Sequence, residues 1–164
     1  MKKLTVILLS FALAMTAAIA AASTVVFINE IHYDNAGTDT GEAIEIAGPA
    51  GTSLTNWTIE LYNGNGGTVY NTLNLSGTIP NQQNGFGTLS FSATGIQNST
   101  DNLGDGMALV NSSNDLIQFL SYEGSFTASD GAANGRTSTN IGVAEDNSTT
   151  PVGYSLQLSR TGSV

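Results

Sequence analysis

Hydrophobic and polar residues alternate along most of the chain, and the alternation is clearest between residues 27 and 47. The segments FINEIHY at 27–33 and AIEIA at 43–47 both have the two-residue period that is typical of β-strands. The nine residues between them, 34–42, are mostly polar and contain three carboxylates. This pattern predicts two strands joined by an acidic loop.

The same period recurs downstream, and no stretch has the spacing of an amphipathic helix. Turn dipeptides at Asn63-Gly64, Asn65-Gly66 and Asn84-Gly85 supply residues that accept positive φ, as tight hairpins require. Many short strands with such turns predict an all-β chain folded as a β-sandwich. The strands are expected at 25–33, 42–47, 56–63, 68–75, 86–93, 107–111, 115–122 and 154–159.

The apolar residues of these strands predict one core, with Trp57 as its largest side chain. Two segments, 94–106 and 124–153, interrupt the strand rhythm and are expected to be polar surface loops. The other expected core residues are Ile28, Ile44, Ile46, Ile59, Leu61, Leu73, Leu75, Leu89, Phe91, Leu109, Ile117, Phe119, Leu156 and Leu158.

The amino-terminal segment has the features of a secretory signal peptide. Lys2 and Lys3 precede a long apolar run, and small residues at Ala18 and Ala20 form an Ala-x-Ala arrangement. Cleavage after Ala20 or Ala22 fits this pattern. We therefore expect a signal peptide at 1–22, one domain at 23–164, an extracellular location and no transmembrane segment.

The acidic net charge of the chain limits the classes of partner that it can bind. The sequence contains 4 Lys and Arg against 13 Asp and Glu. Loss of Lys2 and Lys3 leaves 2 cations, so the exported chain has a net charge of 2 − 13 = −11. Because nucleic-acid binding depends largely on Lys and Arg, we expect no direct binding to nucleic acid. The sequence contains no cysteine, so disulfides cannot stabilise the fold.

The acidic loop is the one place where candidate ligands are concentrated. Asp34, Asp39, Glu42 and Glu45 lie within twelve residues, with no basic residue among them. Carboxylate oxygens suit Ca²⁺, so a calcium site formed by these four residues is one hypothesis. The alternative is that the aspartates form turns and the glutamates lie on a solvated face. The spacing matches no strict calcium motif.

The sequence argues against an enzyme. His32 is the sole histidine and lies within a strand pattern, there is no cysteine nucleophile, and no Gly-x-Ser-x-Gly motif accompanies the serines. The segment GNGG at 64–67 lacks the Lys-Ser/Thr ending of a phosphate-binding loop and is predicted to be a hairpin. We expect no catalytic residues.

Four segments resemble the bacterial lamin-tail domain: NEI at 29–31, EAIEI at 42–46, NWTIEL at 56–61 and SLQL at 155–158. The resemblance covers nearly the whole chain after the signal segment, and it implies an immunoglobulin-like β-sandwich without catalytic apparatus. HYDNAGTDTGEAIEIAGPAG at 32–51 and FLSYEG at 119–124 are most similar to the module near the amino terminus of extracellular bacterial nucleases. Ala43 departs from the family pattern, which often has an aromatic residue there.

Three functions follow from the resemblance. The leading hypothesis is an exported, non-catalytic interaction or accessory module associated with an extracellular nuclease, with a protein or a cell-surface or matrix ligand as its partner. A second hypothesis is that the chain is the amino-terminal part of such a nuclease, whose catalytic domain lies beyond Val164. A third is a free-standing cell-surface or matrix protein with a structural or adhesive role.

Overall fold

A computed structural model describes residues 25–99 and 103–159. Within these ranges the chain is entirely β-structure and turns, and no helix of this part is long and apolar enough to cross a membrane. The predicted signal peptide lies outside the described residues. The strands are β1 Phe27–His32, β2 Ala43–Pro49, β3 Thr58–Asn63, β4 Thr68–Asn74, β5 Phe86–Ser92, β6 Asp105–Val110, β7 Leu116–Tyr122, β8 Thr139–Asn140 and β9 Leu156–Gln157.

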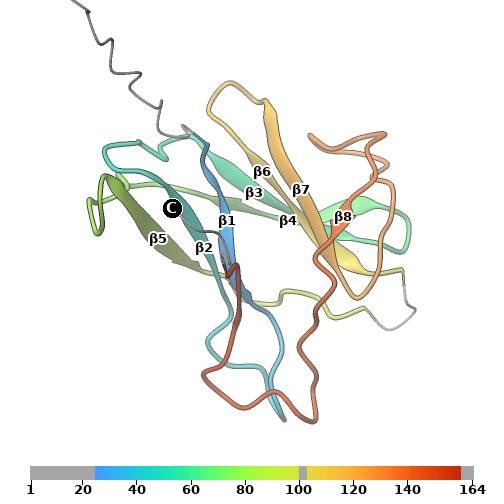
Figure 1. Ribbon diagram of the computed structural model, residues 1–164. Helices are drawn as coiled ribbons and strands as arrows, with labels where there is room; N and C mark the ends of the chain where they lie inside the picture. The colour runs from blue at the N-terminus through green and yellow to red at the C-terminus, as the bar shows by residue number, and fades with distance from the viewer. Residues whose placement is uncertain (1–24, 100–102, 160–164) are drawn as a thin grey trace, which may run out of the picture.

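The strands form two sheets that face each other as a sandwich (Figure 1). One sheet has the order β5-β2-β1-β9, and the other has the order β4-β3-β6-β7-β8. Every pairing is antiparallel except that of β7 with β8. The predicted all-β sandwich and its eight predicted strands are therefore confirmed, while β8 was not expected.

Two of the predicted Asn-Gly turns lie where hairpins begin. GNGG at 64–67 connects β3 to β4, which pair antiparallel. Asn84 and Gly85 have φ values of 49° and 83°, the positive values that a tight turn into β5 needs. An additional β-carbon at Gly64 would lie 1.8 Å from the carbonyl oxygen of Gly104, so that position admits only glycine.

The core between the sheets is built largely from aliphatic residues and tyrosines. The largest fully buried side chains are three tyrosines that were not predicted to be in the core. Tyr33 and Tyr122 lie between the sheets, whereas Tyr62 belongs to a second cluster on the outer face of the five-stranded sheet. Trp57 is only half-buried and precedes β3, so the prediction that it is the largest core side chain is wrong. Ile117 and Leu158 are also outside the core, with 37% and 58% of their surfaces exposed.

A β-bulge at Asn29 explains why strict alternation fails in β1. Ile28 pairs with Ile46 and Glu30 pairs with Glu45, so one extra residue of β1 lies between two consecutive positions of β2. The bulge allows Ile28 and Ile31, three residues apart, to be buried together in the core. The sequence pattern placed these two residues on opposite faces.

The segment 124–153 is not the surface loop that its polar composition predicted. Phe126, Ala128 and Ala133 are buried against the outer face of the five-stranded sheet, where they meet Tyr62 and Phe119. The three aromatic rings pack with centroids 5.2 to 6.3 Å apart. Strand β6 is consequently buried on both faces along its whole length.

Candidate functional site

Two segments far apart in the sequence meet at one end of the sandwich. Residues 33–42, which follow β1, and residues 144–154, which precede β9, lie side by side at the lower end of Figure 1. Ala36 N donates to Thr150 O at 2.8 Å, and Gly37 N donates to Asn147 O at 3.2 Å. We call this contact the polar junction. It contains the acidic loop that the sequence analysis selected.

Glu145 is at the centre of the polar junction. The residue is 4% exposed, and its carboxylate accepts hydrogen bonds from Tyr33 N at 2.6 Å and from Asp34 N at 2.8 Å. The other carboxylate oxygen lies 2.9 Å from His32 Nδ1. A buried carboxylate is costly unless it is paired and hydrogen-bonded, and Glu145 has both kinds of compensation.

His32 is placed to carry a positive charge. Its Nδ1 faces the Glu145 carboxylate, and its Nε2 lies 3.0 Å from the carbonyl oxygen of Thr40. The Glu145 carboxylate and the Thr40 carbonyl are acceptors for the two N–H groups of the imidazolium form, and Asn35 Nδ2, which lies 3.1 Å from Nε2, donates to the same Thr40 oxygen at 3.1 Å. Burial alone would lower the pKa of His32, but the bonds to Glu145 and Thr40 and the charges of Glu145 and Glu42 outweigh burial and raise the pKa above 6.5.

Tyr33 links the junction to the core. Its hydroxyl accepts from Glu145 N at 2.8 Å and donates to Glu123 Oε1 at 3.1 Å, while its ring stacks on Tyr122 with centroids 4.0 Å apart. Burial raises the pKa of the Tyr33 phenol well above its ordinary value, so the hydroxyl stays protonated and remains a donor. Burial likewise raises the pKa of the Glu123 carboxyl.

The two glutamates proposed as calcium ligands bind groups of their own chain. The carboxylate of Glu42 accepts from Gly95 N at 2.7 Å and from Ile96 N at 2.8 Å, and so fixes the segment that follows β5. Glu45 Oε1 accepts from Asn29 Nδ2, the bulge residue of β1, at 2.7 Å. Each glutamate has a role in holding neighbouring segments together.

The two aspartates of the acidic loop differ in exposure. Asp39 is exposed and accepts a long hydrogen bond of 3.3 Å from Asn35 N. Asp34 is 3% exposed, and its Oδ1 has no hydrogen-bond partner. Burial, followed by the nearby Asp39 carboxyl, raises the pKa of Asp34 to about 6.

The structure therefore brings Asp34 and Asp39 together and directs Glu42 and Glu45 to other partners. Within residues 25–99 and 103–159, no three carboxylate, imidazole or thiol groups are arranged to hold one metal ion. Carbonyl oxygens and water also serve as calcium ligands, so calcium binding at the aspartate pair stays a prediction.

Glu145 is the central residue that the sequence analysis missed. It lies in a segment of mostly small and polar residues, where its composition gave no reason to expect burial. The sole histidine could have served as a signal, because a buried imidazole within a strand needs acceptors. The segment 124–153 contains only three carboxylates that could act as such an acceptor, those of Asp130, Glu145 and Asp146.

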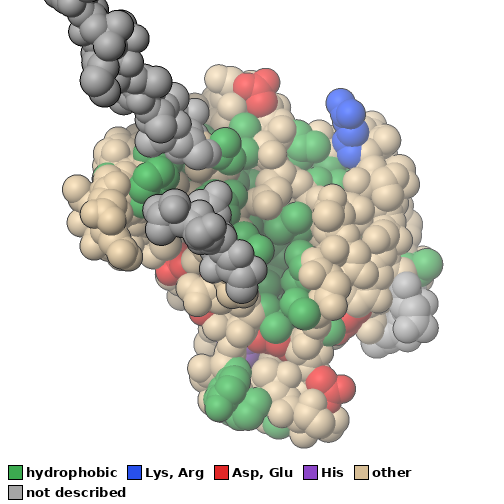
Figure 2. Space-filling model, in the orientation of Figure 1, with side chains coloured by type: hydrophobic (Ala, Val, Ile, Leu, Met, Phe, Trp, Pro, Cys, Tyr) green, Lys and Arg blue, Asp and Glu red, His purple; other side chains and the backbone are tan. Residues whose placement is uncertain are grey.

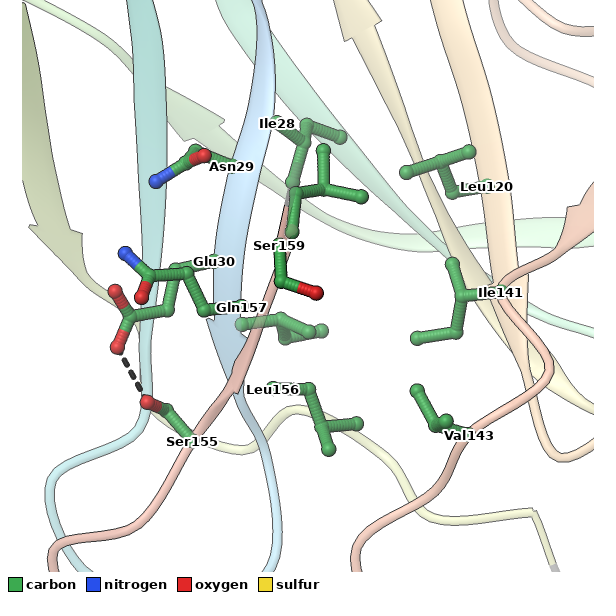
Figure 3. A pocket seen from close by; sticks show the side chains of 12 residues that line it. Ile28, Asn29, Glu30, Leu120, Ile141, Val143, Ser155, Leu156, Gln157 and Ser159 are labelled. Atoms are coloured by element: carbon green, nitrogen blue, oxygen red, sulfur yellow. Dashed lines mark hydrogen bonds between the residues drawn. The ribbon is translucent and has the colours of Figure 1, made fainter. Parts of the chain in front are cut away.

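A second feature, an apolar cleft, opens between the two sheets beside β1 and β9. Its volume is about 470 Å³. In Figure 3 the side chains of Ile28, Leu120, Ile141, Val143 and Leu156 point toward one another across the gap, and Asn29 and Glu30 point away from it. Figure 2 shows hydrophobic side chains gathered along the middle of the same face.

No protein-family model, curated protein or solved structure matches this chain. The site must therefore be judged on its own geometry.

The two features differ in what they can do chemically. In the polar junction the carboxylate of Glu145 and both ring nitrogens of His32 are already engaged, which indicates a structural role. In the apolar cleft Glu30 is the one titratable group among the described lining residues, and it accepts a hydrogen bond from Ser155. The cleft has the composition of a binding surface for apolar groups.

Proposed function

We propose that this chain is an exported, non-catalytic interaction module that binds an extended aliphatic segment of a partner protein in its apolar cleft. The observation that carries the proposal is the cleft itself, which is lined by aliphatic side chains from both sheets. Val143 and Leu158 stand at it with 55% and 58% of their surfaces exposed. A volume of about 470 Å³ falls within the range of roughly 300 to 1,000 Å³ that is usual for ligand pockets.

The edges of the cleft also favour an extended segment. On one side β9 consists of two residues, and on the other β8 consists of two residues, so neither sheet continues across the opening. An extended segment gives alternating side chains, of which every second one faces the same way. Such a segment would place aliphatic groups against Ile28, Ile141 and Leu156.

The resemblance to lamin-tail domains extends this proposal. The nuclease-associated module remains the leading version, in which the partner segment belongs to an extracellular nuclease or its anchor. The amino-terminal part of a longer nuclease and a free-standing matrix protein are the two alternatives. Sequencing the reading frame beyond Val164 separates the second version from the other two.

A photo-crosslinking experiment tests the cleft. A benzophenone side chain replaces Val143 in the complete natural reading frame, expressed in the native host and exported. Val152 provides the matched control because it is 65% exposed and does not line the cleft. We expect a covalent adduct with one defined peptide from position 143 and not from position 152. Equal labelling from the two positions, or none, would contradict the proposal.

A further experiment addresses the non-catalytic part of the proposal. Residues 23–164 are expected neither to cleave DNA in the presence of Mg²⁺ nor to bind it at physiological salt, because the net charge of −11 repels phosphate. Cleavage that a point substitution within these residues abolishes would show that the module is an enzyme.

A further inference from the structure

We propose that strand β5 is a self-association edge, at which two copies of this chain pair antiparallel and join their four-stranded sheets. The two sheets have four edges, formed by β5 and β9 in one sheet and by β4 and β8 in the other. An exposed edge strand is a template for pairing, and proteins usually protect it with short strands, charges, prolines or covering groups.

Three of these four edges have such protection. Strands β8 and β9 contain two residues each. Strand β4 contains seven residues, but side-chain oxygens bind its outward amides: Val69 N donates to Asp130 Oδ1 and Thr72 N donates to Asn71 Oδ1, both at 2.8 Å. These bonds leave β4 with few free donors for a second chain.

The direction of the backbone groups in β5 follows from its pairing with β2. Ala50 N donates to Gly85 O and Ala93 N donates to Glu42 O, so the odd-numbered residues of β5 exchange hydrogen bonds with β2. The even-numbered residues direct their amide and carbonyl groups away from the sheet. Gln82 covers the beginning of this edge, where Thr88 N donates to its side-chain oxygen at 2.6 Å.

The second half of β5 has no such cover. Ser90 and Ser92 are exposed, and within the described ranges no group binds their outward backbone atoms. If two copies pair about a two-fold axis at Phe91, Ser90 of each copy lies opposite Ser92 of the other. This register forms four backbone hydrogen bonds from groups that are otherwise solvated.

Charge identifies a second copy as the occupant. The exported chain has a net charge of −11, yet no Asp, Glu, Lys, Arg or His occurs between residues 61 and 100. This uncharged stretch contains the whole of β5, so two identical acidic molecules repel each other least at this edge. The carboxylates nearest in the sheet, Glu42 and Glu45, already accept hydrogen bonds from Gly95, Ile96 and Asn29.

An apolar hollow of about 460 Å³ adjoins the same strand. Phe27, Ala47 and Phe86 line it together with Val25, and Phe86 and Val25 are 37% and 54% exposed. The hollow lies at the start of β5, so an added strand would extend the sheet next to it and shield part of this apolar surface.

Sedimentation equilibrium on residues 23–164, from micromolar to millimolar concentration, tests the pairing. We expect a reversible monomer–dimer equilibrium that strengthens with NaCl, because salt screens the repulsion between two acidic copies. Ser90→Pro removes an outward amide without removing a bond to β2, and it should weaken the dimer at least tenfold. Thr72→Pro is the control because it places a proline at an outward position of the other long edge strand, β4, where it removes the bond to Asn71 Oδ1 and should leave the dimer unchanged.

Amide hydrogen exchange in the unmodified chain gives a readout that does not depend on whether the variants fold. Protection of the Ser90 and Ser92 amides should rise with protein concentration, and protection of the Thr72 amide should not. A monomer at every concentration and salt level would overturn the proposal. Species larger than the dimer would also overturn the proposal if Thr72→Pro reduced them, because that result would assign the association to β4.

Discussion

Strand β1 meets the carboxyl-terminal part of the chain twice, and the two contacts are opposite in character. At its end, His32 and Tyr33 meet Glu145 in the polar junction, where the interacting groups are buried and hydrogen-bonded. In its middle, Ile28 and Ile31 line one side of the apolar cleft together with Leu156 of the neighbouring strand β9, and Leu120 and Ile141 line the opposite side. A single strand is thus fixed by buried polar groups at its end, and a few residues away it borders a cleft whose exposed apolar side chains, Val143 and Leu158, belong to other segments.

The largest loss of stability is expected from removal of the Glu145 carboxylate in the polar junction. Glu145→Ala leaves the His32 imidazole without its buried counter-ion and two backbone amides without an acceptor. We expect a loss of about 3 to 5 kcal/mol in the free energy of unfolding, the range for breaking a buried ion pair on one side. Urea unfolding followed by tryptophan fluorescence measures the loss.

Glu145→Gln is the control for this prediction. It keeps the shape and one acceptor oxygen, so its loss should be clearly smaller than that of Glu145→Ala. If both variants unfold at the same urea concentration as the unmodified chain, Glu145 does not hold the junction.

The second prediction concerns pH. The pKa of His32 in the folded chain lies above 6.5, so the stabilisation from its charge is complete below 6.5 and is lost as pH rises through the folded pKa. Asp34 acts in the same direction at lower pH, because its folded pKa of about 6 exceeds its ordinary 3.8 and the native state retains the proton. The free energy of unfolding should therefore fall as pH rises from about 4 through the His32 transition.

Substitutions of His32 and Asp34 separate the contributions of these two groups to the pH dependence of stability. His32→Gln should remove the upper part of the pH dependence, and Asp34→Asn should reduce the part between about 4 and 6, to which the raised pKa of Glu123 also contributes. Stability curves that rise with pH across this whole interval would show that neither group titrates as described.

A smaller effect is expected from calcium at the acidic loop. A cation bound only to the folded state adds about 1.4 kcal/mol at tenfold excess over its dissociation constant, through relief of the charge shared by Asp34 and Asp39. The thermal midpoint should then rise by a few degrees. NaCl at equal ionic strength is the control, and an equal rise in both salts would exclude a specific site.

Asp39→Asn provides a second check on this prediction, because it removes one carboxylate of the aspartate pair and leaves the bonds of Glu42 to Gly95 and Ile96 in place. This variant should lose the calcium response. If the response survives, the cation binds elsewhere on the chain.

The smallest change in the free energy of unfolding is expected from a substitution in the apolar cleft. Val143 is 55% exposed, so Val143→Ser should change the free energy of unfolding by less than about 0.5 kcal/mol while it weakens partner binding in the cleft. Urea unfolding measures the first quantity. A loss comparable to that of Glu145→Ala would mean that the cleft is part of the core rather than a surface for a partner.

The strands could be predicted from the sequence because alternation is a local signal. The eight predicted strands occur, and most of their aliphatic residues form the core. The errors arise where a nonlocal contact decides burial. Tyr33 and Tyr122, which were absent from the expected core, stack across the sandwich, and the bulge at Asn29 moves Ile28 and Ile31 to the same face.

The site was harder to predict for the same reason. The sequence directed attention to the acidic loop at 34–42, which does form part of the junction. It did not single out Glu145 from the three carboxylates of segment 124–153, because the distance along the chain from His32 to Glu145 is 113 residues and only the folded topology brings them together. The carboxylates of Glu42 and Glu45 looked available in the sequence, but backbone and side-chain donors of other segments occupy them.

The long separation between β1 and its carboxyl-terminal contacts also sets the order in which the molecule can be assembled. Ser155 contacts Glu30 across 125 residues, and pairings of such long range form slowly because a large loop must close first. A chain that emerges amino terminus first can pair β1 with β2 early, but the other edge of β1 stays bare until the last strand appears. If residues 1–22 direct export, the chain as far as β9 must cross the membrane before the second edge of β1 is paired, and translocation of this domain therefore precedes completion of its native state.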